Sequence, residues 1–346
     1  AKPDELIALT QTASEYGGGY MAHMRSEAYR LNESLEELIA IARQTKAHAE
    51  VYHMKAGGQD NWPKMVQMIA SINQARAEGL SVSANMYTYT AGATGFDASM
   101  PPWVQEGGHD SWVTRLKDPK IRAQIIQEMR TPNNAWENLY LMAGAQGSKL
   151  VGFRTEKLKP LTGKTLAEVA QMRGTSPEDT IIDLIIEDNS RIEVVYFLMS
   201  EDNVQLGLQQ PWVSLGSDAG AMAPEGVFLK SSTHPRAYGN FARWLGHYVR
   251  DEKLTTLEDG IYRLTGLPAK NWKIRDRGCL AVGCYADMVI FDPSKIQDYA
   301  TFDKPQQFSF GVNQVWVNGQ QVLKDGEPTD ARPGRVVRGP GWVGWK

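Results

Sequence analysis

Two histidines and one aspartate stand at or near the ends of three predicted strands. The chain has six histidines, and His23 and His53 lie thirty positions apart on successive predicted strands. Asp218 ends another predicted strand, in the sequence VSLGSDAG. Consecutive parallel strands bring their carboxyl ends to one face, so the two imidazoles could share a metal ion there. A carboxylate beside them could take a proton from a metal-activated water and return it to a leaving nitrogen.

Each of these residues, taken alone, also has a structural explanation. A histidine at a strand end is commonly a hydrogen-bonding residue of the framework, and SDAG is commonly a turn. Spacing by itself therefore leaves the metal site and the structural explanation both open. His48 precedes its predicted strand, and we expect it on the surface.

The elements that must position these residues alternate along the chain. Apolar residues recur at helical spacing over 4–16, 34–45 and 62–78, and strand-like runs cover 20–25, 49–54 and 80–87. Strands that alternate with helices predict parallel βα units, so the expected class is α/β, a sheet or barrel covered by helices. We place about four core strands, around Met21, Val51, Val82 and Val213.

The alternation of predicted strands and helices is interrupted over residues 95–200, where Pro, Gly and Trp are frequent. We interpret this stretch as an insertion between two core strands, with a helix over 175–187 that has Ser176 as N-cap and Pro177 at its first position. After residue 268 the sequence becomes all-β, with NG and DG turns. The expected domains are a barrel portion over 1–268 and a small β domain over 269–346.

The charge and hydropathy of the chain give no indication of nucleic acid or a membrane as a partner. A formal net charge of -3 gives no electrostatic case for nucleic acid or an anionic membrane, and no apolar run approaches the ~20 residues that span a bilayer. The two cysteines, Cys279 and Cys284, fall in predicted strand sequence without the companion Cys or His of a zinc site. We expect no disulfide and interpret them as small buried side chains. The sequence assigns no compartment.

Seven segments, in order, resemble motifs of the D-aminoacylase (N-acyl-D-amino-acid deacylase) family of the amidohydrolase superfamily. They cover nearly the whole chain: AHMRSE, VYHMKAGG, MYTYTAG, GSDAG, HPRAYGNFARWLG, LTGLPA and DRGCLAVGCYADMVIFDP. The resemblance implies a distorted (β/α)8 barrel with a small β-sandwich built mainly from the C-terminal residues. It also implies that His23 and His53 are zinc ligands and that Asp218 is the catalytic acid and base.

Neighbouring residues acquire roles from the same resemblance. Lys55, Tyr87 and Arg236 resemble the family's contacts to the substrate carboxylate, and the planar fork of an arginine suits a carboxylate. We interpret Arg25 and Glu27, in the same HMRSE motif as His23, as a pair behind the metal ligands.

The chain departs from the family pattern at several places. Thr88 stands where the family usually has proline, Ala93 aligns where a serine is frequent, and the stretch from Asp218 to His234 is longer than in shorter members. The family begins with a strand carrying an HxH pair and a strand supplying a bridging zinc ligand, and neither occurs here. We therefore expect this to be the second half of a barrel. Its N-terminal half would be supplied by an upstream segment or by a separate polypeptide.

The expected activity is zinc-dependent hydrolysis of the amide bond of a small N-acyl-D-amino acid. One alternative is opening of a cyclic amide, as in hydantoinases and dihydroorotases. The HPRAYGNF segment and the lysine of HMK favour the deacylase, because they resemble its carboxylate contacts. A second alternative is an inactive fragment that keeps the fold without a competent metal site.

Overall fold

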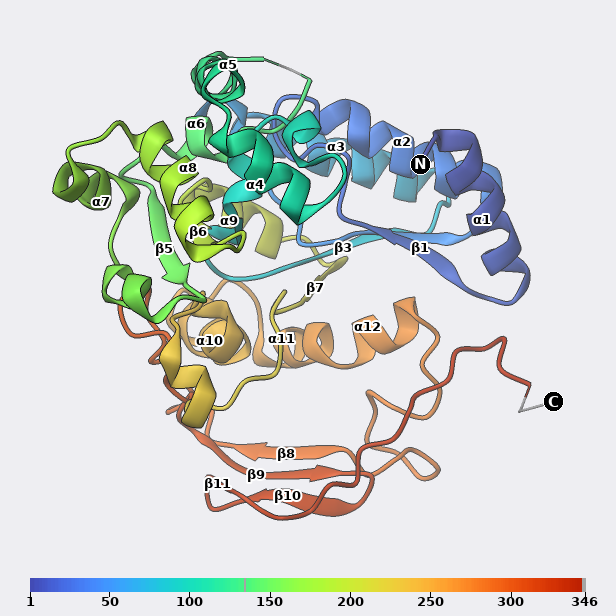
Figure 1. Ribbon diagram of the computed structural model, residues 1–346. Coiled ribbons are helices and arrows are strands. Elements are labelled where there is room, and N and C mark those ends of the chain that lie inside the picture. The colour runs from blue at the N-terminus through green and yellow to red at the C-terminus, as the bar shows by residue number, and fades with distance from the viewer. Residues whose placement is uncertain (134, 344–346) are drawn as a thin grey trace.

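The computed structural model describes residues 1–133 and 135–343, and a four-stranded parallel sheet lies at its centre (Figure 1). Its strand order is β1 (Gly19–Ala22), β2 (His48–Val51), β3 (Val82–Met86) and β7 (Val213–Leu215). All three neighbouring pairs are parallel. The four core strands predicted from the sequence are therefore confirmed.

Alternate residues of this sheet face two different environments. Ala49, Val51, Val82 and Ala84 are completely buried in the main hydrophobic core, together with residues of the covering helices. These helices are α2 (Leu31–Thr45), α3 (Lys64–Ala77) and α9 (Glu201–Leu208), and α1 (Pro3–Glu15) packs against α2. The other sheet face is polar and carries Glu50, Ser83, Asn85 and Ser214. None of the helices in the described ranges combines the length and apolarity that a membrane span requires.

The segment between β3 and β7 contains a second sheet. Its strands are antiparallel in the order β4 (Gly92–Gly95), β6 (Glu193–Tyr196) and β5 (Ser148–Gly152). Five helices accompany it: α4 (His109–Lys117), α5 (Pro119–Arg130), α6 (Leu139–Ala143), α7 (Leu166–Arg173) and α8 (Pro177–Asp188). Strands β4 and β5 were not predicted, because short runs such as GATG carry no alternation of apolar and polar residues.

The C-terminal part contains helices and then an antiparallel sheet, drawn in orange to red below the central sheet in Figure 1. The helices are α10 (Arg236–Arg243), a π-helix (Trp244–Asp251), α11 (Leu257–Leu264) and α12 (Gly266–Asn271). The sheet has the order β11 (Glu327–Pro328), β10 (Gln320–Lys324), β9 (Val312–Val317) and β8 (Met288–Phe291). Asn318 and Gly319, both with positive φ, form the predicted NG turn between β9 and β10.

The prediction for the cysteines was wrong. Cys279 and Cys284 form a disulfide in an irregular loop before β8, and Cys279 is exposed. Gly278 and Gly283 each precede one of the cysteines with φ of 75° and 96°. Only glycine adopts such angles readily, so this loop can fold back on itself and bring the two sulfur atoms together.

Helix α8 begins as the sequence predicts and is tied to its neighbours by a buried carboxylate. Ser176 accepts a hydrogen bond from the Asp179 amide at 3.1 Å, and Pro177 follows it. Glu178, with 6% of its side chain exposed, accepts hydrogen bonds from Arg130 and from the Tyr140 hydroxyl, each at 2.9 Å. Burial alone would raise the pKa of Glu178, but these contacts lower it to about 2.

We expect Glu178→Gln to lower the free energy of unfolding by about 1–3 kcal/mol at pH 7. The folded-state pKa lies below the unfolded value, so the contribution of Glu178 is present above pH ~4.5 and is lost as the pH falls toward 2. Urea unfolding between pH 7 and pH 3 should therefore show the two proteins converging. Glu187→Gln, which breaks a more exposed ion pair on the same helix, should change little. A difference that did not vary with pH would contradict this assignment.

Candidate functional site

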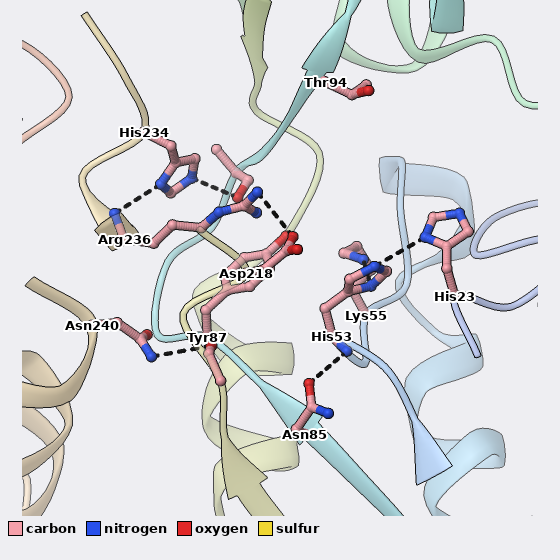
Figure 2. Close-up of polar contacts among 12 residues, drawn as sticks. His23, His53, Lys55, Asn85, Tyr87, Thr94, Asp218, His234, Arg236 and Asn240 are labelled. Carbon is pink, nitrogen blue, oxygen red and sulfur yellow. Dashed lines mark hydrogen bonds and ion pairs between the residues drawn. The ribbon is translucent and has the colours of Figure 1, made fainter. Parts of the chain in front are cut away.

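His23 and His53 meet just beyond the carboxyl ends of β1 and β2. Nδ1 of His23 lies 3.0 Å from Nε2 of His53, and the two rings meet edge to face (Figure 2). Two histidine nitrogens on one tetrahedral zinc ion would be about 3.3 Å apart, given Zn–N bonds of about 2.0–2.1 Å. The pair therefore has nearly the separation that a shared metal ion requires.

Glu27 and Lys55 lie directly behind the ring of His53. Both carboxylate oxygens of Glu27 are 2.8 Å from the Lys55 ammonium nitrogen, and Oε1 is 2.9 Å from His53 Nδ1. Lys55 Nζ is also 2.6 Å from that Nδ1. A metal on Nε2 requires the proton on Nδ1, where Glu27 accepts it, which is how carboxylates commonly orient metal-binding histidines. Within the described ranges, His23, Glu27 and His53 form the only group of three or more His, Cys, Asp or Glu residues close enough together to hold a metal.

The ion pair between Lys55 and Glu27 is buried on both sides, with 7% and 10% of the side chains exposed. Burial disfavours both charges, but the Lys55 charge and the hydrogen bond from His53 lower the pKa of Glu27 to about 2. Burial likewise opposes the Lys55 charge, yet Glu27 raises the pKa of Lys55 above its usual value. Both groups are therefore charged at neutral pH.

Asp218 and Arg236 face these residues from the opposite side. Arg236 Nη2 lies 2.9 Å from Asp218 Oδ2, and Figure 2 shows the pair across from His23 and His53. Tyr87 is buried beneath them, with its ring centroid 4.6 Å from the Arg236 guanidinium and 5.9 Å from Lys55 Nζ. Arg236 Nε is buried and has no hydrogen-bond partner in the part of the chain that the structure describes. It is a donor that a bound carboxylate could satisfy.

The histidine pair with Glu27 and Lys55, and the Asp218–Arg236 pair with Tyr87, line one cavity of about 480 Å³. The remaining wall is mostly small or apolar, with Gly92, Ala93, Thr94, Ala98, Leu139 and Leu198, and Glu137 is its one charged residue. The structure thus brings all six predicted site residues to one cavity, as two sets on facing walls. Asp218 is not part of the close histidine group.

Sequence reasoning missed His234, which fixes the start of the helix bearing Arg236. His234 Nε2 donates to the Ala91 carbonyl at 2.8 Å, and Nδ1 accepts from the Arg236 amide at 3.0 Å. The imidazole is 2% exposed, and burial lowers its pKa to about 3, so it is neutral. Its position in the HPRAYG segment, two residues before Arg236, was the sequence feature that could have indicated this role.

Asn240 was not predicted from the sequence either, and its contacts explain why Thr88 stands where the family usually has proline. Its Oδ1 accepts from the Thr88 amide at 2.9 Å, and its Nδ2 donates to the Gly216 carbonyl at 3.1 Å. A proline at position 88 has no amide proton and could not make the first bond. Threonine here therefore joins the segment after β3 to the turn that carries Asp218.

Two predictions about neighbouring residues were wrong. Arg25 pairs with the Glu37 carboxylate at 2.9 Å rather than with Glu27, so only Glu27 of the predicted pair lies behind a histidine, 2.9 Å from His53 Nδ1. His48 is 8% exposed rather than on the surface, because it is the first residue of β2 and its Nε2 lies 3.1 Å from the Ser83 hydroxyl on the polar sheet face.

Comparison with known proteins gives the family. Residues 103–323, well over half of the chain, match the model of the amidohydrolase family. The chain is 30% identical over 338 residues to an N-acyl-D-glutamate deacylase of Alcaligenes xylosoxydans xylosoxydans, covering 98% of this chain and 58% of the relative. It is 30% identical over 337 residues to a D-aminoacylase of the same organism, covering 97% and 58%.

A solved structure gives the same result. The N-acyl-D-glutamate deacylase of Bordetella bronchiseptica, complexed with zinc and a phosphonate that mimics the reaction's tetrahedral intermediate, superposes with a TM-score of 0.76 at 29% identity. The match covers 98% of this chain and 60% of that one. The chain belongs to the amidohydrolase family, and it spans somewhat more than half the length of these relatives.

We expect Glu27→Ala to lower the free energy of unfolding by about 3–5 kcal/mol, because it leaves the Lys55 ammonium buried without a partner. Urea denaturation measures the change. Replacing both charges, in Glu27→Leu combined with Lys55→Met, should recover most of the loss. Glu37→Gln, which breaks the more exposed pair with Arg25, is the control and should cost below about 1 kcal/mol. A loss from Glu27→Ala as small as that of the control would show that the inner pair is not desolvated.

Proposed function

We propose that the chain carries the metal-binding and substrate-binding residues of a zinc-dependent hydrolase of N-acyl-D-amino acids. The observation that carries this proposal is the pairing of two facing walls in one cavity. One wall holds the histidine nitrogens 3.0 Å apart, and the other holds Arg236 beside Asp218. The relatives support it, because their names specify deacylation of N-acyl-D-glutamate and D-aminoacylase activity.

The histidine wall would hold the metal through His23 Nδ1 and His53 Nε2. Zinc there would supply Lewis-acid polarisation of the scissile carbonyl and acidify the attacking water. Asp218 takes the proton of that water as the new C–O bond forms. It then gives the proton to the nitrogen as the C–N bond breaks, releasing a carboxylate and a D-amino acid.

The other groups of the cavity bind the free carboxylate of the substrate. Arg236 would supply its unpartnered Nε, and Tyr87 would supply its hydroxyl, whose partner in the structure is the Met199 sulfur at 3.8 Å. Two N–H groups of the Lys55 ammonium donate to Glu27, and the third faces His53 Nδ1. When His53 Nδ1 carries a proton it cannot accept this third N–H, which then becomes available to the substrate carboxylate. Holding the carboxylate on one side and the carbonyl on the other fixes two points around the α-carbon, and the cavity wall that meets the substrate side chain would supply the third contact that distinguishes D from L.

The chain fold proposed for this function is part of a (β/α)8 barrel over 1–268 with a small β-sandwich over 269–346. Strands β1 and β7 form the two edges of the central sheet, where further barrel strands would pair, from the same or a separate polypeptide. In the C-terminal sheet, Met288 and Ile290 of β8 share one face and are 37% and 51% exposed, which suits a second sheet layer over that face. The 58–60% coverage of the relatives supports the same arrangement.

The choice of substrate distinguishes the proposed deacylase from the alternative, a cyclic-amide hydrolase. A hydantoin ring has no free carboxylate for Arg236 to bind, whereas an N-acyl amino acid does. We expect the zinc-loaded protein, with its barrel complete, to hydrolyse N-acetyl-D-methionine and to leave N-acetyl-L-methionine and hydantoin largely unchanged, as followed by amine release and by chromatography. Turnover of hydantoin alone would overturn the proposal.

Zinc content tests both the ligand assignment and the inactive-fragment alternative. In the protein with its barrel complete, we expect His23→Ala and His53→Ala each to lower bound zinc and activity together, because each removes a metal-binding nitrogen. Atomic absorption after removal of free metal measures the content. His109→Ala, which alters a half-buried histidine on α4, should leave the zinc content unchanged. Full zinc occupancy in the double His23, His53 variant would contradict the assignment, and a wild-type protein that never retains zinc would favour the inactive alternative.

Arg236→Ala tests the carboxylate contact. We expect kcat/KM for N-acetyl-D-methionine to fall by about 10–1000-fold, as expected for loss of a charge-assisted contact in a partly desolvated site. The control is the matching N-acetyl amine without a carboxylate, whose slow turnover should hardly change. An equal loss on both compounds would assign the arginine a different role.

A further inference from the structure

The backbone at two functional residues lies in the left-handed region. His53 has φ of 41° and Asp218 has φ of 49°, and neither is glycine. A left-handed backbone is unfavourable for a residue with a Cβ, and it persists only where the surroundings impose it. The hydrogen bonds that impose it at His53 come from the polar face of the central sheet.

We propose that Glu50 and Asn85 form a buried positioning pair that sets the backbone, and hence the ring direction, of His53. Asn85 Oδ1 accepts a hydrogen bond from the His53 amide at 2.9 Å, as Figure 2 shows. The carbonyl of the same Asn85 accepts from the Met54 amide at 2.8 Å. One residue of β3 thus holds two consecutive amides of the turn after β2.

Glu50 determines which way the Asn85 amide points. Asn85 Nδ2 donates to Glu50 Oε1 at 2.7 Å, and a carboxylate can only accept. The amide nitrogen must therefore face Glu50, which leaves its oxygen for His53. Glu50 is 2% exposed, and its second oxygen accepts from the Ser83 hydroxyl at 2.8 Å and from Trp272 Nε1 at 3.1 Å. The carboxylate is thereby held from two further directions.

The pair also touches the turn that carries Asp218. A Cβ placed on Gly216 would come within 3.2 Å of Asn85 Oδ1, so the amide lies against this backbone two residues before Asp218. The Gly216 amide itself donates to the Met86 carbonyl at 3.0 Å. Asn85 therefore lies between the two turns, next to both the proposed ligand and the proposed acid and base.

This inference rests on the proposed metal site, but its first test does not need the metal. In the zinc-free protein, the His53 amide should be protected from hydrogen exchange, and Asn85→Leu should remove that protection. The second test is zinc affinity, from competition with a chelator, together with the visible spectrum of the Co²⁺ form. We expect Asn85→Leu and Glu50→Ala to weaken zinc binding by about 10–100-fold, the usual effect of losing a partner behind a ligand, and to alter the Co²⁺ spectrum.

Matched variants separate positioning from general stability. Ser83→Ala removes another partner of Glu50 and leaves the Asn85–His53 bond intact, so it should lower Tm without changing zinc affinity. Glu50→Gln keeps an acceptor for Asn85 and should bind zinc within a few-fold of wild type. If Asn85→Leu does not fold, Asn85→Asp takes its place. That variant sets two carboxylates together and should bind zinc weakly, whereas adding Glu50→Gln should restore binding.

The outcomes are distinct. Wild-type zinc affinity and an unchanged Co²⁺ spectrum in both Asn85→Leu and Glu50→Ala, with only a lower Tm, would overturn the proposal and leave a structural role. Failure of Asn85→Asp combined with Glu50→Gln to recover affinity would also overturn it. A wild-type protein without zinc affinity would refute the proposed function, and the exchange of the His53 amide would still test the positioning pair.

Discussion

The buried ion pair between Lys55 and Glu27 is the interaction on which the proposed site depends. Charges are costly to bury, and each of these is tolerated because the other lies 2.8 Å away. The same carboxylate reaches His53 Nδ1, so the pair also directs Nε2 of that ring toward His23. A structural requirement, the neutralisation of a buried lysine, and a chemical one, the orientation of a ligand, are met by one carboxylate.

The central sheet imposes the second constraint. Its parallel strands end on one side, and the residues that follow them must turn sharply to present side chains to a common cavity. Left-handed backbone at His53 and Asp218 accomplishes this, and buried amides stabilise it: Asn85 on the His53 side and Asn240 on the Gly216 side. The polar sheet face is therefore the support of the site as well as part of the interior.

The sequence predicts local patterns well and long-range partners poorly. Helical and strand periodicity located the four parallel strands, and the strand-end positions of His23 and His53 were sufficient to bring the two residues together. The partner of Glu27, Lys55, lies 28 positions away in the loop after β2, so the motif wrongly suggested the neighbouring Arg25. Strand β4 pairs with β6 about a hundred residues later, and the four residues GATG contain no pattern that predicts this pairing.

Anomalous diffraction at the zinc edge, from crystals of the zinc-loaded protein, tests the central claim most directly. The account predicts a peak about 2.0–2.1 Å from both His23 Nδ1 and His53 Nε2, with Glu27 still bound to Lys55 and to His53 Nδ1. A zinc ion coordinated by the Glu27 carboxylate with Lys55 displaced, or a peak away from the two histidines, would contradict it.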